Sequence, residues 1–196
     1  MRGTRGHGDA GTGGKLLFEE QSAGSLEPLR ASLLQMAAVR RALGNRGGLI
    51  ETLRALVDVC LRLEDWPGAI AAAEELVALR AADAELWAGL GDARLNVGYA
   101  SGAADAYRQA VALASREPML RRNYADSLIR SGRLDEAARQ LDAAEKLEPA
   151  APLLALHRAE LARARGDRVG TRRWAEEALR RQPGMREALA LLREDV

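Results

Sequence analysis

The sequence has few of the residues that build metal centres, disulfide bonds and redox sites. Its 196 residues include one cysteine, Cys60, and two histidines, His7 and His157. A lone cysteine excludes an intramolecular disulfide, and this small set excludes a cysteine-based zinc site. No serine, cysteine or carboxylate stands in a recognisable catalytic frame, and residues 1–15 do not match a phosphate-binding loop. We therefore expect no cofactor, no metal and no enzymatic activity.

Long apolar segments are also missing. No stretch approaches the ~20 consecutive apolar residues of a membrane span. Residues 1–15 lack the apolar core of a secretory signal. These absences predict a cytoplasmic protein without a membrane span. Nearly all basic residues are arginine, only Lys15 and Lys146 being lysines, and with the abundant alanine this suggests a GC-rich bacterial genome.

Neither sign of charge is in excess, since 29 Lys and Arg face 28 Asp and Glu. Arginines gather only between Arg165 and Arg181, where Glu176 and Glu177 interrupt them, and aromatic residues make up 4% of the chain. Non-specific nucleic-acid binding usually needs a domain-wide basic balance together with stacking aromatics. The composition therefore argues against nucleic-acid binding.

The N-terminal quarter of the chain differs from the rest. Residues 1–15 contain six glycines and predict a disordered tail. Residues 16–49 predict a capping region with one long helix that ends near Gly44, with Ser25 as N-cap and Pro28 in the first turn. This helix either caps the helical array that follows or forms an arm that occupies a groove. Its apolar stripe consists of Leu26, Leu29, Leu33, Met36, Val39 and Leu43.

From residue 50 the sequence repeats with a period of 34 residues, in blocks 50–83, 84–117, 118–151 and 152–185. Each block has two apolar-periodic segments that predict a pair of helices. A glycine between the two segments suits a helix end, because glycine adopts the left-handed conformation without a Cβ clash. Residues 186–196 continue as a half-repeat and predict a C-terminal capping helix. The fifteenth positions are Glu64, Gly98, Gly132 and Gly166, and the twentieth are Ala69, Ala103, Ala137 and Thr171.

This pattern resembles the tetratricopeptide repeat (TPR) family over residues 50–185. The resemblance implies an all-α fold, a right-handed superhelical solenoid of four helix-turn-helix repeats with a helical cap at each end. It also implies that the first helices line a concave groove. Departures from the motif occur at Arg94, Val57, Leu76, Arg158 and Thr171. The matching residues are Trp87, Leu90, Gly91, Ala103, Tyr107 and Ala110 in the second block and Gly132, Ala137, Leu141, Ala144 and Pro149 in the third.

The ninth position of every block is acidic, and the resemblance places this position in the groove. These residues are Asp58, Asp92, Asp126 and Glu160. Arginines lie four residues before and after Asp58 (Arg54 and Arg62) and Asp126 (Arg122 and Arg130), which predicts ion pairs within their helices. Asp92 and Glu160 lack such neighbours, so we expect them to be free for a ligand. The alternative is that all four acids form hydrogen bonds between repeats.

The predicted function is that of a non-catalytic adaptor or assembly scaffold that binds a peptide segment of another protein in the groove. Carboxylates on the groove predict a partner with basic residues. One alternative is head-to-tail self-association, because the net charge runs from −4 in residues 50–83 to +4 in residues 152–185. A second is an arginine-rich nucleic-acid-binding solenoid. The candidate groove residues are Arg54, Asp58, Asp92, Asn96, Arg122, Asn123, Asp126, Arg130, His157 and Glu160.

Overall fold

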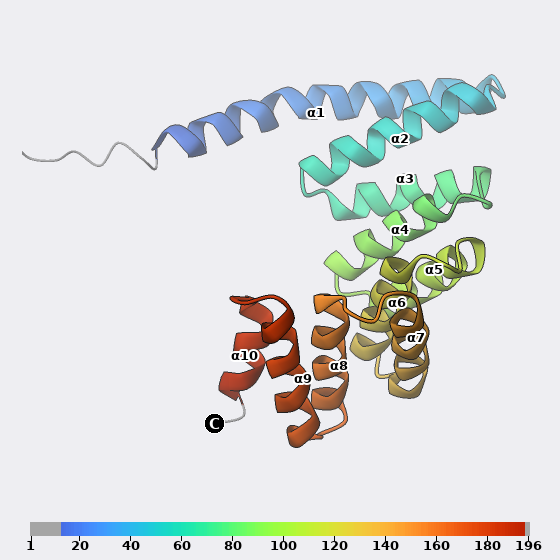
Figure 1. Cartoon of the computed structure of the whole chain (residues 1–196). Coiled ribbons are helices and arrows are strands. Elements are labelled where there is room, and N and C mark those ends of the chain that lie inside the picture. Colours follow the sequence, from blue (N-terminus) through green and yellow to red (C-terminus); the bar gives the residue numbers. More distant parts are fainter. Residues whose placement is uncertain (1–12, 195–196) are drawn as a thin grey trace, which may run out of the picture. The chain divides into compact units, whose positions relative to one another are not determined.

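The computed structural model describes the backbone of residues 13–194 and the side chains of residues 26–193. Within this described range the chain forms ten α-helices and no strand (Figure 1). The helices are α1 (Gly13–Ala42), α2 (Arg46–Arg62), α3 (Trp66–Leu79), α4 (Ala84–Asn96), α5 (Ala100–Leu113), α6 (Pro118–Arg130), α7 (Leu134–Leu147), α8 (Pro152–Ala164), α9 (Arg168–Arg181) and α10 (Arg186–Glu194).

Helix starts follow the sequence period from the second block onward. The first helices of three blocks begin at Ala84, Pro118 and Pro152. Their second helices begin at Ala100, Leu134 and Arg168, so both series advance by 34 residues. The predicted all-α fold of stacked helix-turn-helix repeats is confirmed. In the part of the chain that the structure describes, no helix is both long enough and apolar enough to cross a membrane.

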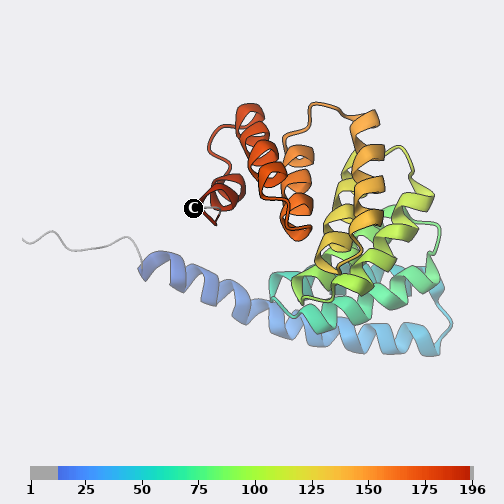
Figure 2. The ribbon, with the colours of Figure 1, turned by 90° about the horizontal axis from the view of Figure 1, so that it is seen from below.

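The described chain forms two compact units, one ending at Glu75 and the other beginning at Leu76. In the first unit, α1 packs along α2, and its first half extends beyond the end of α2 (Figures 1 and 2). Leu33 and Ala37 are buried, and α2 begins four residues before the predicted first block. Asn45 caps α2, because its side-chain oxygen accepts a hydrogen bond from the Gly48 amide at 3.0 Å.

The predicted start of α1 was wrong. The helix begins at Gly13, so Ser25 is not an N-cap and Pro28 lies inside the helix. A proline removes one backbone hydrogen bond, but it does not prevent a helix in the strong helix formers upstream, residues 16–20. The helix thus includes the last three residues of the predicted tail, and residues 1–12 lie outside the described range.

The turn inside each repeat has one residue in the left-handed region. Gly98, Gly132 and Gly166 have φ of 76°, 78° and 75°. Glu64 occupies the same position in the first block with φ 56°, where a side chain is strained. The backbone geometry of this turn therefore explains why glycine recurs at the fifteenth position.

The second unit buries a core between α4 and α10. Small residues at the helix contacts, such as Ala103 and Ala137, are fully buried, which lets neighbouring helices approach closely. Tyr107 is also fully buried and lies against Gly91. A Cβ atom on Gly91 would lie 2.8 Å from Cε2 of Tyr107, so only glycine fits beneath the ring. This close approach brings the Tyr107 hydroxyl to the next residue, Asp92.

Candidate functional site

The ten predicted groove residues are divided between the two units. Arg54 and Asp58 lie on α2 in the first unit, and the other eight lie in the second unit on α4, α6 and α8. The second, fifth and ninth positions of these three helices share one helical face, because three- and four-residue steps follow one side of a helix. We call this surface the groove face. It consists of Glu85, Ala88, Asp92, Met119, Arg122, Asp126, Leu153, Leu156 and Glu160.

Asp92 is exposed, but it is not free as predicted. The hydroxyl of Tyr107 on α5 donates a hydrogen bond to its Oδ1 atom. Burial and the contact with Asp92 both raise the pKa of Tyr107, so the phenol stays protonated as the donor. Asn96, also predicted for the groove, donates from Nδ2 to the Asp92 carbonyl oxygen at 3.0 Å. Sequence reasoning missed Tyr107 because only neighbours on the same helix were considered.

The predicted arginine pairs form only in part. Arg62 Nη1 lies 4.0 Å from Asp58 Oδ2, and both side chains are more than half exposed. Arg130 Nη1 lies 3.9 Å from Asp126 Oδ2. Arg122 was expected to pair with Asp126 as well, but it turns to Glu148 beyond α7, with Nη1 2.6 Å from Oε2. Its side chain is only 10% exposed, so burial favours this short ion pair over a solvated one.

Asp126 and Glu160 form a partly buried pair of carboxylates on α6 and α8. Burial, followed by the charge of Asp126, raises the pKa of Glu160 to about 7. Burial also raises the pKa of Asp126, against the opposing effect of Arg130. Glu160 Oε2 is buried, and no group in the described residues makes a hydrogen bond to it. This pair can take up a proton or receive a cationic group.

His157 lies one turn before Glu160 and is kept neutral. Burial, followed by the charge of Arg122, lowers its pKa to about 4. Its Nδ1 atom is buried and has no hydrogen-bond partner among the described residues. The imidazole is therefore a neutral wall of the site at pH 7 rather than a cation that would neutralise Asp126 and Glu160.

Two hollows lie on the groove face, at the N-terminal ends of the first helices. The α4–α6 hollow has a volume of about 650 Å³, and the α8–α10 hollow has a volume of about 520 Å³. Glu85, Glu117 and Met119 line the first, and Leu153, Leu156 and Met185 line the second. None of these six residues was predicted as a site residue. The 34-residue period was a signal for them, because each stands at the second, fifth or last position of its block.

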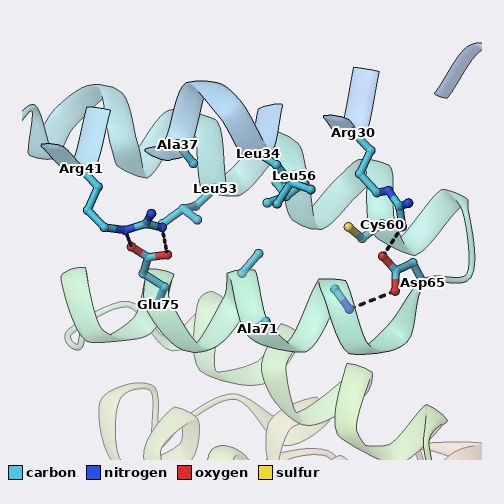
Figure 3. Close-up of a pocket in the computed structure, with 12 residues that line it drawn as sticks. Arg30, Leu34, Ala37, Arg41, Leu53, Leu56, Cys60, Asp65, Ala71 and Glu75 are labelled. Atoms are coloured by element: carbon cyan, nitrogen blue, oxygen red, sulfur yellow. Dashed lines mark hydrogen bonds and ion pairs between the residues drawn. The ribbon is translucent and has the colours of Figure 1, made fainter. Parts of the chain in front are cut away.

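The first unit has a smaller cavity of about 270 Å³ between α1, α2 and α3 (Figure 3). Leu34, Leu53 and Leu56 form its apolar wall. Ion pairs close both ends: Arg30 Nη1 lies 2.6 Å from Asp65 Oδ2, and Arg41 Nη2 lies 2.7 Å from Glu75 Oε2 (Figure 3).

These ion pairs fasten α1 across the helical pair that follows it. The Gly68 amide and then Arg30 lower the pKa of Asp65, so its carboxylate is charged at pH 7. Burial raises the pKa of the nearby Cys60 thiol, which disfavours the reactive thiolate. In the described residues, no group of three or more histidine, cysteine or acidic side chains is placed to hold a metal ion.

Comparisons with known proteins define the fold. No family model and no curated protein matches the sequence. Among solved structures, YrrB, a TPR protein with an unusual peptide-binding site, aligns with a TM-score of 0.66 at 19% identity over 94% of this chain and 99% of its own. TTC0263 from Thermus thermophilus, a thermophilic TPR protein, aligns with a TM-score of 0.60 at 18% identity over 85% of this chain and 98% of its own.

A third similar structure contains a bound peptide. The first TPR domain of Spaghetti (RPAP3), bound to the HSP90 peptide SRMEEVD, aligns with a TM-score of 0.52 at 20% identity. The alignment covers 57% of this chain and 89% of that domain. Together with the 34-residue spacing of the helices, these similarities show that the chain has the tetratricopeptide repeat fold.

Proposed function

We propose that this protein is a non-catalytic adaptor whose groove face binds a basic peptide segment of a partner protein. The observation that carries the proposal is the carboxylate pair of Asp126 and Glu160. A partly buried carboxylate oxygen without a partner destabilises a folded protein. Such a local loss of folding stability is typical of functional sites, where a ligand supplies the missing hydrogen-bond partner.

The charges around the pair favour a basic ligand over an acidic one. Arg122 is engaged by Glu148, and His157 is neutral. Arg163 and Arg130 favour the charged form of Glu160, but burial and the charge of Asp126 outweigh them. A lysine or arginine side chain of a partner would supply both a hydrogen-bond donor and a positive charge. The RPAP3 domain binds the acidic peptide SRMEEVD. We expect the opposite preference here, because acidic side chains recur on the groove face.

Quantitative affinity capture from lysate tests the proposal. The full chain serves as bait, and the double variant Asp126→Asn, Glu160→Gln is compared with the wild type. We expect the variant to retain less than about a fifth of the captured partner, because each lost charge-assisted hydrogen bond weakens binding by about 1.5 kcal/mol or more.

The matched control is Asp105→Asn, Glu176→Gln, which removes the same charge from two exposed carboxylates away from the groove face. It should capture as much partner as the wild type. Equal capture by the wild type and the groove variant would show that the carboxylate pair takes no part in recognition. Circular dichroism of the double variant and of the wild type separates a loss of recognition from a loss of folding.

A further inference from the structure

The two hollows on the groove face are equivalent positions of the repeat, two repeats apart. Each lies beside the fifth position of one first helix and the second position of the next. In the α4–α6 hollow the fifth position is Ala88, and in the α8–α10 hollow it is Leu156. Residue 31 of the same block, Ala114 or Gln182, completes each wall.

The equivalent position between them is closed by an ion pair. There the fifth position is Arg122 and position 31 is Glu148, and Nη1 of Arg122 lies 2.6 Å from Oε2 of Glu148. With only a tenth of its side chain exposed, the Arg122 guanidinium fills the place where the neighbouring repeats are open. The groove face therefore offers two separate side-chain sites instead of one continuous channel.

The two hollows differ in chemistry. Asp83, Glu85, Asp92 and Glu117 line the α4–α6 hollow against a single cation, Arg80. Arg80 Nη2 lies 3.7 Å from Asp83 Oδ2, which leaves the wall with an excess of negative charge. Leu153, Leu156 and Met185 form an apolar wall of the α8–α10 hollow, and Leu153 is 45% exposed. The rest of the lining is Gln182, Gly184 and the oppositely charged Arg186 and Glu187, so this hollow has no excess of either charge.

We propose that the groove face binds a partner segment through two anchors, a basic side chain in the α4–α6 hollow and an apolar side chain in the α8–α10 hollow. This rests on the proposed function and adds the chemistry and spacing of the ligand. Helices that pack directly, as α6 does on α8 and α8 on α10, are about 10 Å apart, so two repeats separate the anchors by at least roughly 20 Å. An extended segment rises about 3.3 Å per residue and spans this distance in about six residues.

Synthetic peptides test this spacing. Each fluorescein-labelled peptide has fourteen residues in a Gly/Ser background, with one arginine and one leucine separated by two to eleven residues. A Gly/Ser background disfavours helix, so the peptides bind in extended form. With the full chain, fluorescence anisotropy should give the lowest Kd at a separation of about six. The negative control is a Gly/Ser peptide of the same length with glutamate in place of the arginine and serine in place of the leucine.

Variants assign each anchor to its hollow. Two further peptides of the same length contain the arginine alone or the leucine alone. Glu85→Gln, Glu117→Gln should raise the Kd about fivefold for peptides that contain arginine, and should leave the Kd of the peptide with leucine alone unchanged. Leu153→Ser should do the reverse. Arg122→Ala, Glu148→Ala should open the middle position and add a second optimum near three residues. Circular dichroism confirms that each variant is folded.

A Kd that does not depend on the separation would overturn the two-anchor proposal, even if the peptides bind. The proposal also fails if no peptide in the series binds at concentrations up to about 1 mM. Neither result decides the proposed function, because the capture experiment with Asp126→Asn, Glu160→Gln tests that function on other residues and with natural partners.

Discussion

Replacing Glu160 by glutamine should stabilise the protein at alkaline pH. Burial and Asp126 raise the pKa of Glu160 from its ordinary value of 4.5 to about 7. The folded state therefore binds a proton more tightly than the unfolded state. The contribution of Glu160 to stability is therefore fully present below pH 4.5 and is lost as pH rises through 7. Each unit of pKa corresponds to about 1.4 kcal/mol, so the full shift corresponds to about 3.5 kcal/mol. Because the Glu160 side chain is partly exposed, solvent screening reduces the cost of its ionised form to about 2 to 3 kcal/mol.

Glutamine has the shape of glutamic acid without its charge, so Glu160→Gln removes this cost. We expect the free energy of unfolding to rise by about 2 kcal/mol at pH 8 and to change by less than about 0.5 kcal/mol at pH 5. Urea denaturation followed by circular dichroism measures both values. Comparison at equal pH cancels the effect of His157, whose lowered pKa makes both proteins less stable as pH falls below 6.5 toward 4.

Glu51→Gln is the matched control, because Glu51 is exposed on α2. It should change stability by less than about 0.5 kcal/mol at either pH. A Glu160→Gln variant with no gain at pH 8 would refute the argument that the carboxylate is held at a cost. A gain of equal size at pH 5 and pH 8 would refute it too, since the effect would then come from packing rather than charge.

Four further outcomes are expected. Glu64→Gly should stabilise the chain by about 1 kcal/mol, because glycine relieves the strain of the left-handed conformation. Gly98→Glu should destabilise it by a similar amount through backbone strain alone, since no atom lies within 4 Å of a Cβ atom there. Thermal unfolding measures both changes. Gly91→Leu should lower stability by at least about 1 to 3 kcal/mol, because even its Cβ overlaps the ring of Tyr107, and an unchanged Tm would contradict that packing. Tyr107→Phe should cost about 1 kcal/mol in chemical denaturation through the lost bond to Asp92, and a neutral result would mean that water replaces the hydroxyl fully. Light scattering tests the alternative of head-to-tail association, which requires a mass that rises with concentration and falls with added salt.

Much of the fold could be predicted because the signals are local. The fifteenth-position glycines mark turns whose left-handed φ only glycine adopts without strain, and they set the ends of α4, α6 and α8. Apolar spacing within each block then defines two helices. The start of α1 could not be predicted, since Ser25 and Pro28 make a favourable N-terminal signal that the actual helix passes through.

The sequence by itself determined the period, the helical pairs and the row of acidic residues at the ninth position, because each follows from the spacing of residue types along the chain. Only the tertiary structure decided which acids are satisfied. Tyr107 donates a hydrogen bond to Asp92, which lies 15 residues before it in the sequence. Arg122 forms its ion pair with Glu148, 26 residues further along the chain, rather than with the predicted partner Asp126. The stacking of the helices determines which side chains meet in this way. It also buries Glu160 near Asp126, and both effects raise the pKa of Glu160.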